Sequence, residues 1–353
     1  MAEITLNKQH PLYQEDLQHI LCTDSIQKLY GKRFLITGAT GLLGVCLIDA
    51  LMLANHAGAD IEIYAVGRSK EKAFGRLGAH FNHPHFHFIE QDVRNPLPEN
   101  LDVDIIIPLA SNTHPLAYSQ YPIETIDINV KGAEHALEKA LQCEATVLYP
   151  SSVEIYGNAK GDDIFTEDYT GQLTLSTARA CYTESKRLSE ALCQSYIAEQ
   201  NVKVKIARLS RIFGPTMLMT DSKASSQFIL KALSDEDIVL KSKGVQLFSY
   251  TYVADAVSGL LFILLHGEVG TPYNVACEAC NVQLKTFAQY CADWAQRQVV
   301  FDLPTETEQK GFSIAMRAIL DNSRLKAIGW HPAYDMRDAV NRTLNILKTR
   351  NDE

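Results

Sequence analysis

Between residues 31 and 210, the pattern of apolar and polar residues has two kinds of segment. Short apolar runs, each long enough for one strand, are separated by stretches in which apolar residues recur at helical spacing. Strands that alternate with helices in this way form βαβ units, whose strands make a parallel sheet with helices on both faces. The predicted strands cover residues 33–37, 61–66, 86–92, 103–110, 145–152 and 204–210. The pattern predicts an α/β fold with a doubly wound parallel sheet over residues 31–210.

The two ends of the chain have different patterns. Residues 1–30 have the spacing of an amphipathic helix and predict a helical extension packed on the outside. After Ser210 the alternation becomes irregular, with shorter helical segments separated by loops and short strands. Ligands of an open α/β sheet bind beyond the carboxyl ends of its strands. Residues 211–353 are therefore predicted mainly as a smaller, substrate-binding lobe, with some strands and helices that return to the sheet.

A glycine-rich loop, GATGLLG, lies between the first predicted strand and the helix after it. Glycines here allow a tight turn, a close approach of the backbone to a pyrophosphate, and close packing of the helix on the strand. Because strand, loop and helix occur in this order, the loop predicts a Rossmann-like site for a dinucleotide. The expected contacts come from Gly38, Thr40, Gly41, Leu42, Leu43 and Gly44.

The ends of the next strands supply the other expected contacts with the cofactor. An NAD-selective site would place a carboxylate after the second strand, for the ribose hydroxyls. The chain instead has Arg68, whose planar cation suits a 2′-phosphate, so NADP is favoured over NAD. NAD stays open, since an arginine here is also able to stack on the adenine or face solvent. Further contacts are expected from Asp92, Val93, Leu109, Ala110 and Ser111.

Tyr182 and Lys186 are four residues apart and lie on one face of a predicted helix. A phenol with an ordinary pKa of about 10 is a poor base at neutral pH, and a nearby ammonium favours the phenolate. Ser152 ends the fifth predicted strand, and its hydroxyl is suited to bind the same substrate oxygen. The three residues predict a catalytic acid and base unit, in which Tyr182 and Lys186 also contact the cofactor.

Four segments carry a resemblance to a known family: GATGLLG, SSVEIYG, YTESK and ARLSRIFGP, in this order. With them, the chain resembles the extended short-chain dehydrogenases of the NAD-dependent epimerase/dehydratase family from about residue 30 to residue 348. The resemblance implies a Rossmann domain, a nucleotide-activated sugar as substrate, and hydride transfer at a sugar carbon. It also implies a homodimer built on the helices after the fourth and fifth strands.

Within the family, the segment ARACYTESKR is most similar to the UDP-glucuronate decarboxylases. That branch implies a catalytic role for Glu154 and a functional arginine at Arg317. Its reaction oxidises the sugar at C4, releases carbon dioxide and then reduces the ketone. The resemblance and the positions of the residues predict substrate contacts from Thr113, His114, Glu154, Arg211, Phe248 and Arg317.

Three positions depart from the family pattern. Val153 replaces a serine or an aspartate, Arg211 replaces an asparagine, and Phe248 replaces an arginine. One arginine lost and one gained indicate either a relocated phosphate contact or a different substrate. An NADPH-dependent reductase of a nucleotide-activated keto sugar therefore stays open, as does an epimerase. A catalytically silent scaffold that binds a dinucleotide is disfavoured, because Ser152, Tyr182 and Lys186 are all present.

The composition limits the kinds of partner and the cellular compartment that we expect. Asp and Glu outnumber Lys and Arg by 42 to 33, for a net charge of −9, which disfavours a nucleic-acid surface. The sequence contains no apolar run of the roughly 18 residues that a membrane helix needs, and its start is polar. Eight scattered cysteines are typical of reduced thiols. We expect a cytoplasmic protein with no membrane or nucleic-acid partner.

Two patterns are weak metal signals. Cys277 and Cys280 form one CxxC without a second pair or a nearby histidine. His83, His85 and His87 alternate, but no carboxylate or cysteine stands at ligand spacing. We expect buried thiols in the first pattern, partly exposed histidines in the second, and no metal site in either.

Overall fold

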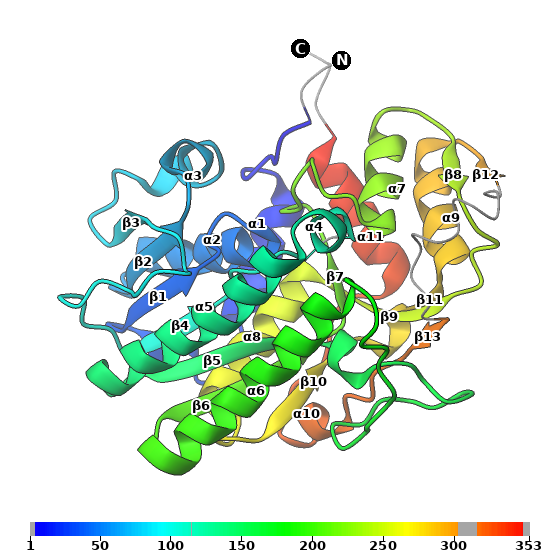
Figure 1. The fold of residues 1–353 in the computed structure, drawn as a ribbon. Helices are drawn as coiled ribbons and strands as arrows, with labels where there is room; N and C mark the ends of the chain where they lie inside the picture. Colours follow the sequence, from blue (N-terminus) through cyan, green and yellow to red (C-terminus); the bar gives the residue numbers. More distant parts are fainter. Residues whose placement is uncertain (1–3, 114, 303–315, 349–353) are drawn as a thin grey trace.

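The computed structural model describes residues 4–113, 115–302 and 316–348. A sheet of seven parallel strands runs through the molecule in the order β10-β6-β5-β4-β1-β2-β3 (Figure 1). The strands are β1 (Arg33–Thr37), β2 (Glu62–Gly67), β3 (Phe86–Glu90), β4 (Ile105–Pro108), β5 (Thr146–Ser152), β6 (Lys203–Leu209) and β10 (Pro272–Val275). The strand order reverses at β1, which has β2 on one side and β4 on the other. Ligands of open α/β sheets bind beyond the carboxyl ends of the strands at such a reversal.

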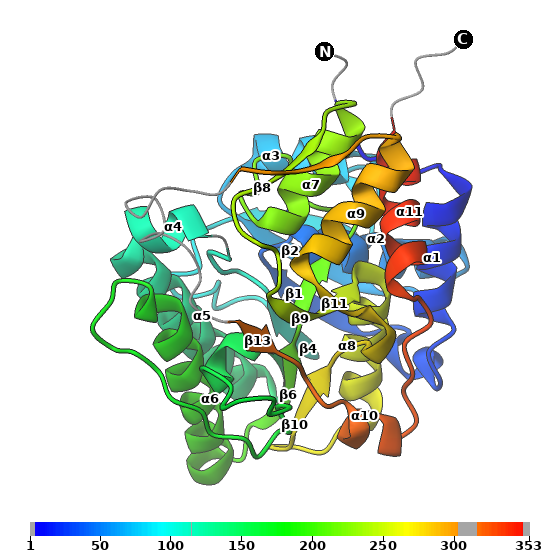
Figure 2. The same ribbon diagram turned by 90° about the vertical axis from the view of Figure 1, so that its right-hand side faces the viewer.

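Helices cover both faces of this sheet. On one face α5 and α6 pack against each other, and on the other face α2 packs against α8 (Figure 2). Near β3, the short helix α3 also contacts α2. These helices are α2 (Leu42–His56), α3 (Lys70–Leu77), α5 (Pro122–Cys143), α6 (Ala180–Gln200) and α8 (Val253–His266). The predicted α/β fold with a doubly wound parallel sheet is confirmed.

The N-terminal helix α1 (Pro11–Leu21) packs on α2 and α8 and also contacts α11 (Met336–Leu347). His10 caps α1, because its Nδ1 accepts a hydrogen bond from the backbone N–H of Leu12 at 3.2 Å. Asp16 of α1 is fully buried, and its carboxylate accepts hydrogen bonds from the Tyr252 hydroxyl and the Arg342 guanidinium. A buried carboxylate needs such partners to offset its loss of hydration. The helix is thus fixed to both early and late parts of the chain.

Helix α8 is apolar on almost every side and is buried from Val253 to Leu264. A helix without a polar face is stable only where it is enclosed, and α8 is enclosed by the sheet, α1 and α2. Within the described ranges, no helix combines the length and the apolar character needed to cross a membrane. The apolar surface of α8 therefore belongs to the core.

The chain after residue 210 contributes to a second, smaller group of elements. Its four-stranded sheet contains β7 (Arg211–Phe213), β9 (Leu247–Tyr252), β11 (Asn281–Gln283) and β13 (Arg317–Ala318), and β8 (Ile238–Leu240) pairs with β12 (Val299–Phe301). Helices α7 (Ala224–Leu233), α9 (Leu284–Ala295) and α11 pack against one another there. The remaining short helices are α4 (Pro115–Gln120), α10 (Ser323–Ala327) and the 3-10 turns η1 (Ile26–Leu29), η2 (Gly78–His80), η3 (Val153–Tyr156) and η4 (Glu278–Cys280). Because β10 and α8 lie in the central layers, a domain boundary at residue 210 stays a prediction.

Candidate active site

The glycine loop turns sharply between β1 and α2, and the space around it requires two of its glycines. Gly38 has a φ of +63°, and a Cβ atom there would lie 2.6 Å from the nitrogen of Ala110 and 2.7 Å from the carbonyl carbon of Leu109. A Cβ atom on Gly44 would lie 2.5 Å from the carbonyl oxygen of Gly38. The predicted contacts Thr40, Gly41, Leu42 and Leu43 lie between these glycines, at the N-terminus of α2. Free N–H groups at a helix N-terminus bind phosphates, so the loop fits a dinucleotide.

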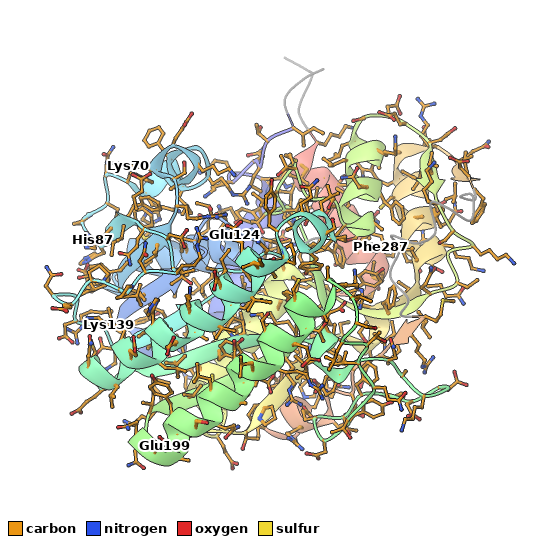
Figure 3. All side chains as sticks on the ribbon, in the orientation of Figure 1. Lys70, His87, Glu124, Lys139, Glu199 and Phe287 are labelled. Atoms are coloured by element: carbon orange, nitrogen blue, oxygen red, sulfur yellow. The ribbon has the colours of Figure 1, made fainter. Side chains whose placement is uncertain are left out.

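The residues expected around the adenosine form ion pairs at the next strand ends. Arg68 follows β2, and its Nη1 lies 2.7 Å from the Glu124 carboxylate at the start of α5, where Figure 3 labels Glu124. The Arg68 side chain is 58% exposed, so this pair contributes little stability and leaves the cation accessible to an anion. Hydrogen bonds from Arg94 lower the pKa of the Asp92 carboxyl. Val93 is buried beside α5.

A chain of hydrogen bonds joins the segment after β4 to α6. Ser111 donates to the side-chain oxygen of Asn129 at 2.7 Å, and Asn129 donates to the Ser185 hydroxyl at 2.8 Å. The N–H of Ala110 donates to the Thr37 hydroxyl at 3.2 Å. Asn129 lies inside α5, and no motif around it in the sequence indicates a role. These contacts fix the helix that carries the predicted catalytic pair.

The Tyr182 phenol of α6 lies within reach of the Ser152 hydroxyl at the end of β5. Burial raises the pKa of Tyr182 to about 12, while the hydrogen bond with Ser152 lowers it and the negative charge of Glu154 raises it. Helix α6 and strand β5 therefore bring two predicted catalytic residues together. The two hydroxyl groups can contact one substrate oxygen.

Lys186 lies one turn further along α6. Its Nζ donates to the carbonyl oxygen of Pro150 at 2.8 Å and lies 5.1 Å from the centre of the Tyr149 ring. Burial lowers the pKa of Lys186 to about 8. Burial thus favours the neutral phenol at Tyr182 and the neutral amine at Lys186. The stabilisation of a phenolate by the Lys186 ammonium stays a prediction.

Tyr118 and Arg179 also belong to this site, although neither is among the predicted site residues. The Tyr118 ring stacks on the Tyr182 ring with 4.9 Å between their centres. Arg179 immediately precedes α6, and its guanidinium carbon lies 5.9 Å from the centre of the Tyr118 ring. Tyr118 is in a six-residue helix that has no motif. Arg179 lies in the segment ARACYTESKR, which carries the resemblance to the decarboxylases, but no spacing assigns it a role.

Glu154 lies in η3, two residues after Ser152, between two arginines. One of its carboxylate oxygens lies 3.4 Å from Nη2 of Arg211, and the other lies 3.7 Å from Nη2 of Arg179. The backbone N–H of Glu154 donates to the Ser152 hydroxyl at 3.3 Å. The Arg211 guanidinium carbon lies 3.7 Å from the centre of the Phe248 ring. Three of the predicted substrate residues therefore meet beside Tyr182.

Comparison with known proteins shows the family. The model of the NAD dependent epimerase/dehydratase family matches residues 34–276. The chain belongs to this family. The UDP-glucuronic acid decarboxylase 1 of Danio rerio is 32% identical over 317 residues, which are 90% of this chain and 72% of that protein. The decarboxylase of the same name from Xenopus tropicalis is 30% identical over 320 residues, with the same two shares.

Solved structures share the fold of this epimerase/dehydratase family member. The UDP-glucuronic acid 4-epimerase from Bacillus cereus, in complex with UDP-glucuronic acid and NAD, has a TM-score of 0.76 at 19% identity and covers 90% of this chain and 99% of that chain. The dTDP-glucose 4,6-dehydratase from Bacillus anthracis, in complex with NAD, has a TM-score of 0.75 at 18% identity, with shares of 91% and 97%. Family membership confirms an enzyme of the extended short-chain dehydrogenase/reductase type and argues against the silent scaffold.

The other predicted substrate residues of this family member have different surroundings. Arg317 of β13 directs its guanidinium to residues 162–163, where Nε donates to the Asp163 carbonyl at 3.4 Å and Nη1 lies 3.8 Å from the Asp162 carboxylate. Thr113 is exposed in the loop before α4. His114 lies outside the described residues. A substrate contact from each of these residues stays a prediction.

The histidine series contacts a carboxylate that its spacing did not reveal. Glu62 on the neighbouring strand β2 lies 2.5 Å from Nδ1 of His85 and 2.8 Å from Nε2 of His87, which Figure 3 labels. The spacing along the sequence does not indicate this carboxylate, because β2 and β3 are adjacent only in the folded sheet. Even so, the described ranges contain no group of three or more histidine, cysteine or acidic side chains arranged to hold a metal ion. Cys277 and Cys280 are buried near the Tyr334 carbonyl.

Proposed function

We propose that the protein oxidises and decarboxylates a nucleotide-linked uronate with a tightly held NAD or NADP. The observation that carries the proposal is the contact between Ser152 and Tyr182, with Lys186 one turn away on the same helix. The decarboxylase relatives, 30–32% identical over 90% of the chain, support the choice of reaction.

The catalytic residues have distinct roles in this proposal. The Tyr182 phenolate takes the proton of the sugar C4 hydroxyl during oxidation, and the phenol returns a proton when the ketone is reduced. Ser152 hydrogen-bonds the same oxygen and limits its movement. A dinucleotide held at the glycine loop would supply the hydride acceptor and, later, the hydride donor. Tyr182 needs nearby positive charge to lower its pKa, and Lys186 supplies it while it is protonated.

The carboxyl group leaves between the two hydride transfers. Oxidation at C4 makes the sugar a β-keto acid, whose C–C bond to the carboxylate breaks to release carbon dioxide. The electron pair of that bond remains on the sugar as an enolate, which takes up one proton. The hydride removed first is then returned to C4. The net reaction consumes one proton and no cofactor.

Product masses test the proposal. The protein is incubated with NAD or NADPH and a panel of nucleotide sugars that contains UDP-glucuronate and UDP-glucose, and the products are analysed by mass spectrometry. We expect a loss of about 44 mass units from a uronate, with no net change of the cofactor. A gain of about 2 mass units with NADPH consumed would instead identify a reductase, and an isomer of unchanged mass would identify an epimerase.

For the choice of cofactor, we propose that Arg68 favours NADP by binding the 2′-phosphate of its ribose. The exposed pair of Arg68 with Glu124 supports this role, because an exposed ion pair is readily exchanged for another anion. We expect Arg68→Asp to shift the ratio of NAD to NADP affinity towards NAD by about 10-fold or more. Titration of both cofactors into the two proteins measures the ratio, and an unchanged ratio contradicts the role of Arg68.

For assembly and compartment, we propose a cytoplasmic homodimer. Exposed apolar side chains on α5 and α6, Ile123, Ile126 and Leu188, support the dimer, because a pair of helices with an apolar outer face can form a four-helix contact with a second copy. The scattered cysteines, all eight of them unpaired, support the reducing compartment.

A further inference from the structure

The Arg211 side chain has one donor group that is buried without an acceptor. Its Nη2 faces Glu154 at 3.4 Å, and its guanidinium rests on the Phe248 ring. Its Nη1 is buried and has no hydrogen-bond partner among the described residues. A buried N–H of a charged group costs free energy unless an acceptor completes it. The unpaired Nη1 therefore leaves the Arg211 guanidinium one acceptor short, and a ligand that supplies this acceptor must displace the atoms that cover Nη1.

The charge around Arg211 favours an anion as that acceptor. The Glu154 carboxylate lies between two guanidinium cations, those of Arg211 and Arg179. Two positive charges and one negative charge leave this cluster with one uncompensated positive charge. The three side chains are 23–35% exposed, so a ligand has access to them. A planar guanidinium binds a carboxylate through two parallel hydrogen bonds.

The cluster lies beside the reacting groups. The Glu154 N–H donates to the Ser152 hydroxyl, and Arg179 lies over the Tyr118 ring, which stacks on Tyr182. A sugar hydroxyl held by Ser152 and Tyr182 therefore has its neighbouring ring substituents next to the cluster. On a hexuronate oxidised at C4, the carboxyl group is attached to the adjacent carbon. The diphosphate is attached to the anomeric carbon, further round the ring.

We infer that Arg211 and Arg179 form the binding site for the carboxylate of the sugar, and that Arg211 makes the enzyme select nucleotide uronates over neutral nucleotide hexoses. This inference rests on the proposed function, because it assumes that the sugar hydroxyl binds at Ser152 and Tyr182. Phe248 is a positioning residue in it. The ring is 6% exposed and holds the plane of the Arg211 guanidinium from one side, so that Nη1 keeps its direction.

The test compares the affinities for UDP-glucuronate and UDP-glucose by calorimetry, in the presence of NAD. We expect Arg211→Gln to weaken UDP-glucuronate binding by about 10- to 100-fold and UDP-glucose binding by less than about 3-fold, because only the carboxylate loses a charged partner. Phe248→Leu is expected to reduce the preference for the uronate by a smaller factor. Arg337→Gln is the matched control, since Arg337 also lies over an aromatic ring, that of Tyr290, on an exposed surface.

Two results would overturn the inference: an equal loss of affinity for both ligands, which would place Arg211 on a group that they share, or no loss for either. Dinucleotide affinity reports whether each variant is folded. If Arg211→Gln does not fold, Arg211→Lys takes its place, because it keeps the charge and loses the planar pair of donors, and an unchanged preference in that variant overturns the inference. Product masses for the wild type are a separate readout. If the protein prefers UDP-glucuronate but releases no carbon dioxide, the carboxylate site is supported and the proposed decarboxylation is contradicted.

Discussion

At the scale of single residues, the two stacked tyrosines of the site have different chemical surroundings. Both rings are buried, but the Tyr182 hydroxyl contacts Ser152, whereas Tyr118 contributes its ring to the stack. We expect Tyr182→Phe to lower kcat about 100-fold or more, because proton transfer is lost while the ring remains. Tyr118→Phe keeps the same stack and is expected to change kcat by less than about 10-fold.

Steady-state rates and cofactor titrations measure this difference. The affinity for the dinucleotide should stay within about 3-fold in both variants, because neither change touches the glycine loop. Equal losses of kcat in the two variants would show that the Tyr182 phenol does not transfer the proton.

Replacing Lys186 is predicted to raise the stability of the protein and to abolish its activity. In an unfolded chain a lysine has a pKa of about 10.4, and burial lowers the folded value to about 8. Between these pH values the unfolded state binds more protons, so stability rises with pH there, and below about pH 8 the folded protein carries the full cost of the buried charge. We expect Lys186→Met to stabilise the protein by about 2 kcal/mol at pH 7 and to abolish turnover.

Urea unfolding at pH 7 and at pH 10 tests this sign. The gain from Lys186→Met should shrink at the higher pH, because the wild-type amine is then neutral in the folded state. Lys131→Met is the control, since the Lys131 side chain is half exposed on α5 and pairs with Asp127. A gain that is equal at both pH values, or a loss at pH 7, would show that the charge of Lys186 is not what costs stability.

A site residue can be predicted from the sequence when local spacing fixes its place on a helix or strand. Tyr182 and Lys186 share a helix face because they are four residues apart, and Ser152 ends an apolar run that predicts a strand. Tyr118, Asn129 and Arg179 have no such spacing. They reach the site because α4, α5 and α6 pack together, and packing between distant segments leaves no period in the sequence.

At the scale of elements, the glycine loop of the cofactor site packs closely against the backbone that follows β4. We expect Gly38→Ala to cost more than the roughly 1–2 kcal/mol of a left-handed backbone conformation, because its Cβ atom would also clash with the backbone of Ala110. Gly31→Ala is a matched control. Gly31 has a φ of +67°, but a Cβ atom there would meet nothing within 4 Å.

Thermal unfolding and dinucleotide titration separate the two contributions. Gly31→Ala should lower stability by the backbone cost alone and leave the cofactor affinity unchanged. Gly38→Ala should lower stability further and weaken the dinucleotide by about 10-fold or more, since the loop must move away from the phosphates. Similar effects of the two substitutions would mean that the close approach to Ala110 is not important.

The predicted strands of the sheet are present, with ends that differ by at most two residues; the predicted run 103–110, for example, contains β4 at Ile105–Pro108. Two elements of the central layers have no clear pattern in the sequence. β10 has only four residues at the sheet edge, too few for a period. α8 is buried by α1, α2 and the sheet, so its apolar residues are not confined to one face. Both are defined by their surroundings more than by their own sequence.

At the scale of the whole molecule, the first and last described helices are joined. Asp16 of α1 accepts a hydrogen bond from Nε of Arg342 in α11 at 2.9 Å, across 326 residues of sequence. Tyr252, at the end of β9, donates to the other oxygen of the same carboxylate at 2.6 Å. The N-terminal extension is therefore packed into the helical layer beside α2 and α8, and it connects the central sheet with the smaller group of elements.

The outer surface of α5 and α6 carries the prediction for assembly. Ile123 of α5 is 76% exposed and Leu188 of α6 is 54% exposed, and the two helices lie side by side on one face of the molecule (Figure 1). If two copies pair through these helices, a charge on either side chain has to be buried without a partner. We expect Ile123→Glu with Leu188→Glu to convert a dimer of about twice the chain mass into a monomer, because an unpaired buried carboxylate costs several kcal/mol.

Sedimentation velocity over a range of concentrations measures the mass. The matched control is Phe74→Glu, because Phe74 is 62% exposed on α3, away from the α5 and α6 pair, and its replacement should leave the dimer intact. A wild type that sediments as a monomer, or a double variant that stays dimeric, would contradict an interface at α5 and α6. Because Tyr182 and Lys186 lie on α6, a dimer held there would also restrain the helix that carries the catalytic pair, and the monomeric variant should then lose activity without losing its fold.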